Sequence, residues 1–320
     1  MRVALIGFGN VARAFARLLE KQHHVYPFRI AGIHTAHHGT AYSESRLPGE
    51  PQFGPPAPSI EEFLDRSNPD VVAELTTLNP ETGEPAISHI RAAIERGRHV
   101  ITANKGPIAH AYAALRDEAR HRQVEFRFES TVMDGAPVFN MVRNNLPGVK
   151  ILGFTGALNS TSKIVIAALR EGKSMEEGLD EARRLGITEA DASYDIDGWD
   201  SAAKTAALAN VLMDARMTPL EVERQGIGHL TPGEVRRLAE ERKTVCLVSR
   251  ADIDGSGVRL KVCPEALAET DLIASVRGTS NLLLLHTDLM GTVGTVSISP
   301  GVEQTAYGVF SDLVDIAKSV

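Results

Sequence analysis

Cysteine is scarce in this chain of 320 residues, which has only Cys246 and Cys263 and no Cys-x-x-Cys motif. The scarcity argues against a disulfide-stapled secreted fold and makes a reduced, cytoplasmic setting the expectation. No apolar run reaches the length of a membrane-spanning helix. The first residues already have the pattern of a strand, so neither a signal peptide nor a transit peptide is expected.

Positive charge is also in short supply. The chain has 34 lysines and arginines against 41 aspartates and glutamates, a formal net charge of −7, and no basic run. This balance argues against a nucleic-acid partner. The hydrophobic fraction of 43% and the charged fraction of 23% are ordinary for a globular protein, and the length suffices for two domains.

The start of the chain carries a nucleotide-binding pattern. Arg2–Ile6 has the length and apolar character of a buried parallel strand, and a helical pattern extends through Leu19. Between them stands Gly-x-Gly-x-x-Ala, the turn that lets a backbone approach a pyrophosphate at a helix N-terminus. The residues expected to contact a dinucleotide here are Gly7, Phe8, Gly9, Asn10, Val11, Ala12 and Arg13.

The second predicted strand, residues 29–34, bears on the choice of cofactor. No acidic residue occurs between Pro27 and His38. An acid there would bind the ribose 2′-hydroxyl of NAD and would repel a 2′-phosphate. Its absence allows either cofactor and slightly favours NADP, which Arg13 and the nearby histidines could face. A metal site would need a fuller ligand set, so we interpret these histidines as solvated loop residues: His34, His37 and His38.

Strand and helix patterns alternate through the first part of the chain. Predicted strands at 71–76, 99–103 and 124–128 are separated by predicted helices at 84–96 and 108–122. This alternation predicts an α/β fold with a Rossmann-type, doubly wound parallel sheet. Ligands bind at the carboxyl ends of such strands, which here carry Thr76, Thr77 and Lys105. We assign residues 1–137 to a dinucleotide-binding domain.

Residues 138–300 have a different character and predict a mixed α+β second domain. Helical patterns at 138–145 and 201–213 accompany predicted strands at 149–157, 244–250, 257–262, 273–276, 282–287 and 292–298. Several of these strands are short and apolar and need a covered edge, which favours a homodimer formed through this domain. Residues 305–318 again have helical spacing.

The most informative stretch runs from Ala182 to Lys204. It brings Glu189, Asp200 and Lys204 within sixteen residues of one another. A helix that starts near Asp200 would place Asp200 and Lys204 one turn apart on the same face. With Glu189, the stretch then offers two acceptors and one proton donor for a small polar substrate. The alternative is an exposed ion pair worth a few tenths of a kcal/mol. A calcium loop is excluded, because Lys204 occupies the position that an EF-hand gives to a bidentate Glu.

Together with the N-terminal turn, this stretch resembles the signature of the homoserine dehydrogenases, and the resemblance covers nearly the full chain. The matching positions are Ala182, Gly186, Ile187, Thr188, Asp191, Asp195, Ile196, Gly198, Asp200 and Lys204. Ala192 stands where the family usually has Pro. The segments from Thr102 to Lys105 and from Gly156 to Ser162 are also similar to family elements, although Ser160 replaces the usual Gly.

The resemblance implies an NAD(P)-dependent, reversible reduction of L-aspartate 4-semialdehyde to L-homoserine in threonine, methionine and isoleucine biosynthesis. Lys204 would donate the proton, and Lys105 would be a second cation between nicotinamide and substrate. Glu189 and Asp200 would bind the ammonium or hydroxyl group of the substrate. Thr76, Thr77 and Gly301 would also contact the cofactor. A sodium ion would be held by the Glu129 side chain with backbone carbonyls of Val132, Asp134 and Ala136.

Family architecture also implies that a C-terminal helix, residues 301–320, completes the first domain and that residues 138–300 carry substrate binding and dimerisation. The sequence stops at Val320, so no regulatory ACT domain, and no inhibition by threonine through one, is expected. Two other interpretations stay open at this point. One is a related dehydrogenase of another amino-acid-derived aldehyde, and the other is a regulator that senses a cofactor without turnover.

Overall fold

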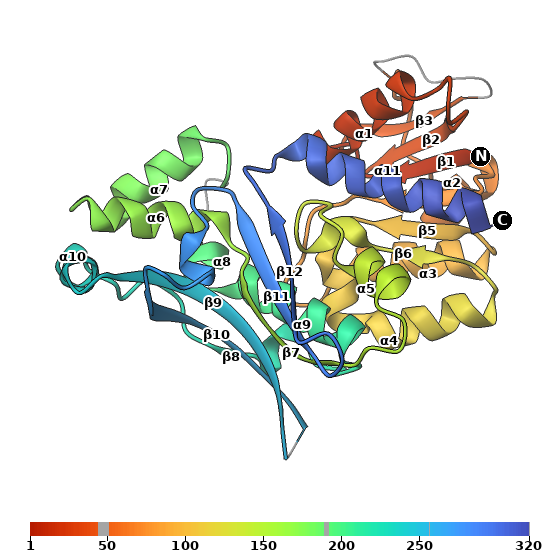
Figure 1. Cartoon of the computed structure of the whole chain (residues 1–320). Coiled ribbons are helices and arrows are strands. Elements are labelled where there is room, and N and C mark those ends of the chain that lie inside the picture. The colour runs from red at the N-terminus through yellow and green to blue at the C-terminus, as the bar shows by residue number, and fades with distance from the viewer. Residues whose placement is uncertain (44–50, 189–191, 256, 320) are drawn as a thin grey trace. The chain divides into compact units, whose positions relative to one another are not determined.

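The structure is a computed structural model that describes residues 1–43, 51–188, 192–255 and 257–319. The chain forms two compact units (Figure 1). The first comprises Met1–Asn140 and Gly301–Val320, and the second comprises Met141–Pro300.

The first unit is built on a six-stranded sheet in the order β3-β2-β1-β4-β5-β6. The strands are β1 (Arg2–Ile6), β2 (Arg29–Thr35), β3 (Gly39–Tyr42), β4 (Val71–Glu74), β5 (His99–Thr102) and β6 (Phe126–Arg127). Neighbouring strands are parallel except β2 and β3. The strand order reverses between β1 and β4, which is where ligands bind in doubly wound sheets. The predicted Rossmann-type sheet is thus confirmed.

The helices of this unit are α1 (Asn10–Lys21), α2 (Ile60–Ser67), α3 (Ala86–Glu95), α4 (Lys105–His121) and α11 (Val302–Ser319), with the 3₁₀ turn η1 (Glu129–Thr131). Helix α5 (Phe139–Asn145) begins in this unit, and its residues from Met141 on belong to the second. Helix α4 begins three residues before its predicted start at residue 108. The reason is its cap: the Asn104 side chain accepts the backbone N–H of Gly106 at 3.0 Å, which satisfies one of the orphan donors of the first turn.

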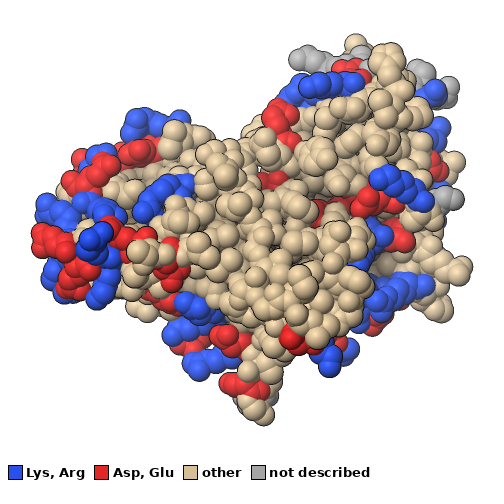
Figure 2. Space-filling model, viewed as in Figure 1, with Lys and Arg blue, Asp and Glu red and all other residues tan. Residues whose placement is uncertain are grey.

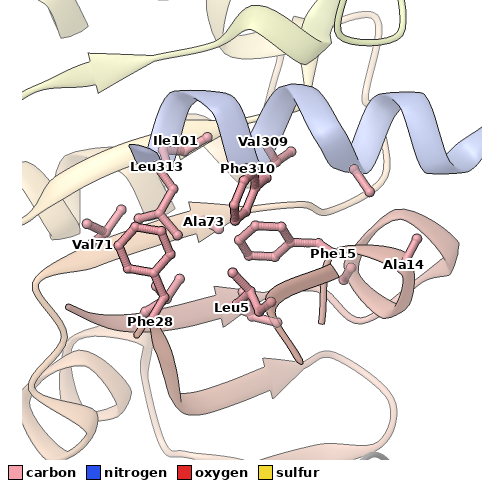
Figure 3. Packing of buried hydrophobic residues seen from close by; sticks show 14 of the residues in the cluster. Leu5, Ala14, Phe15, Phe28, Val71, Ala73, Ile101, Val309, Phe310 and Leu313 are labelled. Atoms are coloured by element: carbon pink, nitrogen blue, oxygen red, sulfur yellow. The ribbon is translucent and has the colours of Figure 1, made fainter. Parts of the chain in front are cut away.

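The core of the first unit joins both ends of the chain. Figure 3 shows Val309, Phe310 and Leu313 of α11 packed over Leu5 and Phe15 from the N-terminal βα unit. Phe15 and Leu313 are fully buried. Burial of a large apolar side chain is worth roughly 1.5–3 kcal/mol, so α11 is an integral part of this unit.

The two units meet in sequence at residues 140 and 141, whereas the composition change placed the boundary after residue 137. The difference has a local cause. The buried carboxylate of Glu129 accepts the backbone N–H groups of Val138 at 2.5 Å, Phe139 at 2.9 Å and Asn140 at 2.6 Å. These three N–H groups stand at the start of α5 and have no acceptor within the helix. By accepting them, Glu129 attaches the start of α5 to the first unit.

The second unit contains a sheet in the order β12-β11-β7-β9-β10-β8. Its strands are β7 (Ile151–Ala157), β8 (Glu223–Arg224), β9 (Lys243–Asp254), β10 (Gly257–Ala268), β11 (Asn281–Thr287) and β12 (Thr292–Ser297). The helical elements are α6 (Ser160–Arg170), α7 (Met175–Arg184), α8 (Ser193–Ile196), α9 (Trp199–Leu212), α10 (Pro232–Glu240), η2 (Pro219–Glu221) and η3 (Ile273–Ser275). Helices α6, α9 and α10 pack on β9 and β10. The predicted mixed α+β domain is confirmed.

The strand predicted at residues 273–276 is wrong, because this segment forms η3. The Asp271 carboxylate accepts the N–H of Ile273 at 2.8 Å, and the Ser275 hydroxyl donates to the Leu272 carbonyl at 2.6 Å. Such local side-chain bonds compete with a sheet ladder. Ile273 and Ala274 are nevertheless buried, since the turn packs them against the sheet core. The apolar run therefore predicted burial correctly, but it wrongly predicted a strand in place of the 3₁₀ turn.

Charged side chains of both signs intermingle around α10 and the adjoining start of β9 (Figure 2). Arg237 and Lys243 lie 2.7 and 3.0 Å from the two carboxylate oxygens of Glu241. One carboxylate thus binds two cations in this part of the surface. Among the described residues, no helix is both long and apolar enough to cross a membrane.

Candidate functional site

The glycine-rich turn has the backbone geometry that a phosphate cradle needs. Gly7 has a φ of +95°, and a β-carbon there would lie 2.6 Å from the Leu75 carbonyl oxygen. Gly9 is the N-cap of α1 without a side-chain cap, and a β-carbon on it would meet nothing within 4 Å. An uncapped helix N-terminus beside open space favours an anion. The predicted turn therefore fits a pyrophosphate.

The carboxyl ends of β4 and β5 are tied together by Asn104. Its amide nitrogen lies 3.2 and 3.3 Å from the backbone oxygens of Thr76 and Thr77, and Lys105 follows it as the first residue of α4. The structure thus brings together three residues predicted from separate segments. Gly301 lies at the start of α11, where its N–H donates to Gln304 at 2.9 Å.

A fully buried carboxylate lies beneath this edge. Glu74 ends β4 and accepts from the hydroxyl of Thr102 at 3.0 Å and from the hydroxyl of Thr76. Thr102 in turn accepts the N–H of Asn104 at 2.9 Å. Glu74 and Asn104 were both missed as site residues. An acid that ends an apolar buried strand and precedes two threonines was the available signal.

The histidines after β2 differ from their interpretation as solvated loop residues in one case. His34 lies within β2, half-buried, with its Nδ1 atom 2.9 Å from the Thr40 hydroxyl. Burial, and secondarily the charge of His89, lowers the pKa of His34. His37 and His38 are exposed as expected. In the described part of the chain, no group of three or more His, Cys, Asp or Glu side chains could hold a metal ion.

The segment expected to bind sodium begins in η1 and continues to Ala136. Glu129 is buried, and its carboxylate accepts the three amides of α5 described above. Asp134 and Gly135 have φ values of +54° and +86°, so the chain bends sharply between Val132 and Ala136. Asp312 of α11 accepts the N–H of Glu129 at 2.8 Å and fixes this segment from the other side.

In the second unit, Asp200 and Lys204 form the pair predicted from their spacing. The Lys204 ammonium lies 3.0 Å from Asp200 Oδ2 and 2.7 Å from the backbone oxygen of Leu158. The two side chains are 16% and 17% exposed. A pair so largely withdrawn from solvent differs from an exposed surface ion pair, which contributes little. The alternative interpretation as a surface pair is therefore wrong.

A hydrogen-bonded network surrounds this pair. The amide nitrogen of Asn159 lies 2.6 Å from Asp195 Oδ1 and 3.0 Å from Asp200 Oδ2. Asp195 also accepts from the hydroxyls of Thr161 at 2.9 Å and Thr188 at 3.0 Å. Asp195 matched the signature, but neither it nor Asn159 was assigned a role. Their pairing joins residues 36 positions apart, which no local pattern reveals.

Two departures from the family pattern have simple outcomes. Ser160 is the first residue of α6 and needs no left-handed backbone, so the replacement of glycine leaves a regular helix start. Ala192 is the N-cap of α8 with φ −95° and ψ 7°. Glu189 and Asp191, both expected from the sequence, lie outside the described residues.

Comparison with known proteins gives one consistent family. Residues 137–314 match the model of homoserine dehydrogenase, and residues 7–129 match the model of the homoserine dehydrogenase NAD-binding domain. An NAD(+)-dependent homoserine dehydrogenase of Pseudomonas canavaninivorans is 33% identical, covering 99% of this chain and 96% of that protein. A homoserine dehydrogenase of Methanocaldococcus jannaschii is also 33% identical, covering 100% and 99%.

Solved structures agree with this result. A homoserine dehydrogenase from Thiobacillus denitrificans has a TM-score of 0.85 at 28% identity, covering 99% of this chain and 73% of that chain. A hyperthermophilic archaeal homoserine dehydrogenase in complex with NADPH has a TM-score of 0.84 at 26% identity, covering 100% and 98%.

Proposed function

Because this chain belongs to the homoserine dehydrogenase family, we propose that it catalyses the reversible, NAD(P)-dependent reduction of L-aspartate 4-semialdehyde to L-homoserine. The observation that carries the proposal is the Lys204 ammonium held by Asp200 and Leu158 in a largely buried setting. The comparisons do not favour a dehydrogenase of a different aldehyde or a regulator without turnover. The decisive experiment is steady-state oxidation of L-homoserine, and no reduction of NAD or NADP would overturn the proposal.

The reaction requires a hydride for the aldehyde carbon and a proton for its oxygen. The bound nicotinamide supplies the hydride. Lys204 supplies the proton and regains one from solvent. In homoserine oxidation, Lys204 first loses a proton to solvent, and its neutral amine then accepts the hydroxyl proton. Asp200 holds the Lys204 ammonium at 3.0 Å, so the donor is oriented before the substrate binds.

The remaining substrate contacts follow from charge. Glu189 and Asp200 bind the substrate ammonium or hydroxyl as hydrogen-bond acceptors. Lys105, at the start of α4 beside Thr76 and Thr77, is the second cation and stabilises the developing alkoxide. The nicotinamide cofactor is held by the turn from Gly7 to Arg13 with Thr76, Thr77 and Gly301.

We favour NADP as cofactor, with NAD also used. The end of β2 offers no acid to bind a 2′-hydroxyl. In the glycine-rich turn, the guanidinium of Arg13 lies over the Phe8 ring, 4.9 Å from its centroid. The relatives differ in this respect, because one is named NAD(+)-dependent and one was solved with NADPH. The test compares kcat/KM for NAD and NADP in the wild type and in Arg13→Ala. NADP alone should lose efficiency in the variant, and a large wild-type preference for NAD would contradict the assignment.

We also infer a sodium ion bound by the Glu129 carboxylate and the carbonyls of Val132, Asp134 and Ala136. All four donors are oxygen atoms, which suits a hard cation. The bend at Asp134 and Gly135 supports the inference, because it folds the carbonyl-bearing segment tightly. The melting temperature should rise in sodium chloride relative to choline chloride at equal ionic strength. Glu129→Gln should abolish the difference, and equal melting of the wild type in both salts would exclude the site.

A homodimer formed through the second unit completes the proposal. β12 is an edge strand of its sheet among the described strands. Val296 within it is 52% exposed, and Ile298 just after it is 77% exposed. Exposed apolar edges call for a partner. Light scattering at micromolar concentration should give the mass of a dimer, and Val296→Lys should weaken it while Leu220→Lys, an exposed leucine on η2, should not. A monomeric wild type would refute the dimer. We place the reaction in the cytoplasm and in threonine, methionine and isoleucine synthesis on the family resemblance.

A further inference from the structure

The junction between β7 and α6 forms a hydrogen bond with each member of the Asp200–Lys204 pair. The Leu158 carbonyl accepts from Lys204 at 2.7 Å, and the next residue, Asn159, donates to Asp200 at 3.0 Å. We propose that Asn159 is a positioning residue that orients Asp200, and through it Lys204, for proton transfer. The inference deepens the proposed function and rests on it.

Asn159 is itself immobilised. It is 3% exposed and is the N-cap of α6, where its side-chain oxygen accepts the N–H of Ser162 at 2.7 Å. An asparagine amide has two N–H donors, and here one is directed at Asp195 and the other at Asp200. Because the helix start fixes the oxygen, the two N–H groups have fixed directions as well.

Asp195 anchors the opposite side. Its carboxylate accepts from Asn159, Thr161 and Thr188 at distances between 2.6 and 3.0 Å. Asn159 therefore stands between a carboxylate held by three donors and the carboxylate that binds Lys204. A neutral amide also separates the like charges of Asp195 and Asp200, whose repulsion would otherwise turn Asp200 away.

The consequence for catalysis is geometric. Asp200 Oδ2 receives both the Asn159 amide and the Lys204 ammonium. Loss of the amide would let the Asp200 carboxylate rotate and carry the ammonium with it. Misplacement by about 1 Å can cost about 100-fold in rate. The turn that holds the cofactor does not depend on this torsion, so the loss should appear in kcat. The KM for homoserine should rise less than on removal of Asp200, because the carboxylate that binds substrate is still present.

Two substitutions separate orientation from capping. Asn159→Ser keeps a side-chain oxygen at the N-cap, since serine caps helices as well as asparagine does, but it removes both amide donors. Asn159→Asp keeps the size and the capping oxygen, yet replaces the amide by a carboxylate next to Asp195 and Asp200. Ser162→Ala is the matched control, because its hydroxyl donates only to the Asn159 backbone oxygen at 3.0 Å among the contacts described here.

The experiment measures kcat and KM for homoserine and for the cofactor in the full-length enzyme, with melting temperature as a check on folding. We expect kcat to fall about 10- to 100-fold in Asn159→Ser and further in Asn159→Asp, with cofactor KM unchanged and Ser162→Ala near wild type. If both Asn159 variants lower the melting temperature but keep wild-type kcat per folded enzyme, Asn159 is structural only and the inference is wrong. An inert wild type would overturn the proposed function itself, whereas an active wild type with normal variants overturns the inference alone.

Discussion

Gly135 and Gly308 lie with their backbones in contact: a β-carbon on Gly308 would come within 2.5 Å of the Gly135 α-carbon and 2.3 Å of the Ser130 hydroxyl. Gly308 is in the middle of α11, and Gly135 follows η1. The crossing holds the C-terminal helix against the segment to which we assign the cation.

Gly308→Ala should lower the free energy of unfolding by about 1–3 kcal/mol, the usual cost of overpacking. Alanine favours a helix over glycine by about 1 kcal/mol, but the clash with backbone atoms outweighs this gain. Denaturant-induced unfolding measures the change. Gly233→Ala in α10 is the control, because a β-carbon there meets nothing within 4 Å. A Gly308→Ala protein as stable as Gly233→Ala would show that the crossing relaxes freely.

Lys204→Ala should depress kcat by about 10²–10⁴-fold, the usual effect of a positioned acid–base group. The cofactor KM should barely change, because the turn that we propose binds the pyrophosphate belongs to the first unit. Lys173→Ala removes a partly exposed lysine that pairs with Glu171 at 2.6 Å and should leave kcat unaltered. Near-normal turnover in a folded Lys204→Ala protein would remove Lys204 from the mechanism.

Asp200→Ala should behave differently from Lys204→Ala. It removes the carboxylate that we propose binds substrate and that pairs with Lys204, so KM for homoserine should rise while kcat falls. Steady-state kinetics in the homoserine-oxidation direction distinguish the two patterns. A fall in kcat with an unchanged KM would restrict Asp200 to orientation.

Acid should destabilise the fold through His99. Burial lowers the pKa of His99, against the opposing charges of Glu125 and Asp70, and its Nδ1 accepts the N–H of Glu125 at 3.0 Å. The unfolded chain therefore takes up the proton first, and stability present above pH about 6.5 is lost as pH falls through the folded pKa. Melting temperatures between pH 7.5 and 5 should decline less steeply in His99→Asn, and His37→Asn, at an exposed site, should match the wild type. Parallel curves for all three proteins would contradict the assignment.

Both thiols should be unreactive in the native protein. Burial raises the pKa of Cys246 to about 11 and also raises that of Cys263. At pH 8 only about 0.1% of Cys246 would be thiolate, the reactive form. Titration with a chromogenic disulfide should detect two thiols when the protein is unfolded in concentrated guanidinium. In the absence of guanidinium, the coloured product should be released slowly. Rapid native reaction of either cysteine would show that its site opens.

The features predicted correctly are those that neighbouring residues determine. Gly7 and Gly9 between a buried strand and a helix specify the turn on their own, and the spacing of Asp200 and Lys204 specifies their shared face. The edge strand β3 went unnoticed because its residues, Gly39–Tyr42, are only half apolar and depend on pairing with β2. The η3 segment was misassigned because burial alone does not distinguish a turn from a strand.

The hydrogen-bonded networks around Asn159 and Glu129 could not be predicted from the sequence, for a related reason. Asp195 and Asn159 are each unremarkable in the sequence, and their contact depends on how α8 and α6 pack. Glu129 resembled a cation ligand, yet its hydrogen bonds to the start of α5 emerge only when that helix is placed. Long-range pairing of polar groups follows from the fold and leaves no periodic trace.

The return of α11 to the first unit has a consequence for how the protein is made. Val309, Phe310 and Leu313 emerge from the ribosome after the whole second unit, although they fill a core begun by Leu5 and Phe15. Throughout translation of residues 141–300, the nascent nucleotide-binding unit lacks α11, and the apolar residues that α11 covers are exposed. The second unit, whose residues are contiguous, can close around its own core before the first unit is finished.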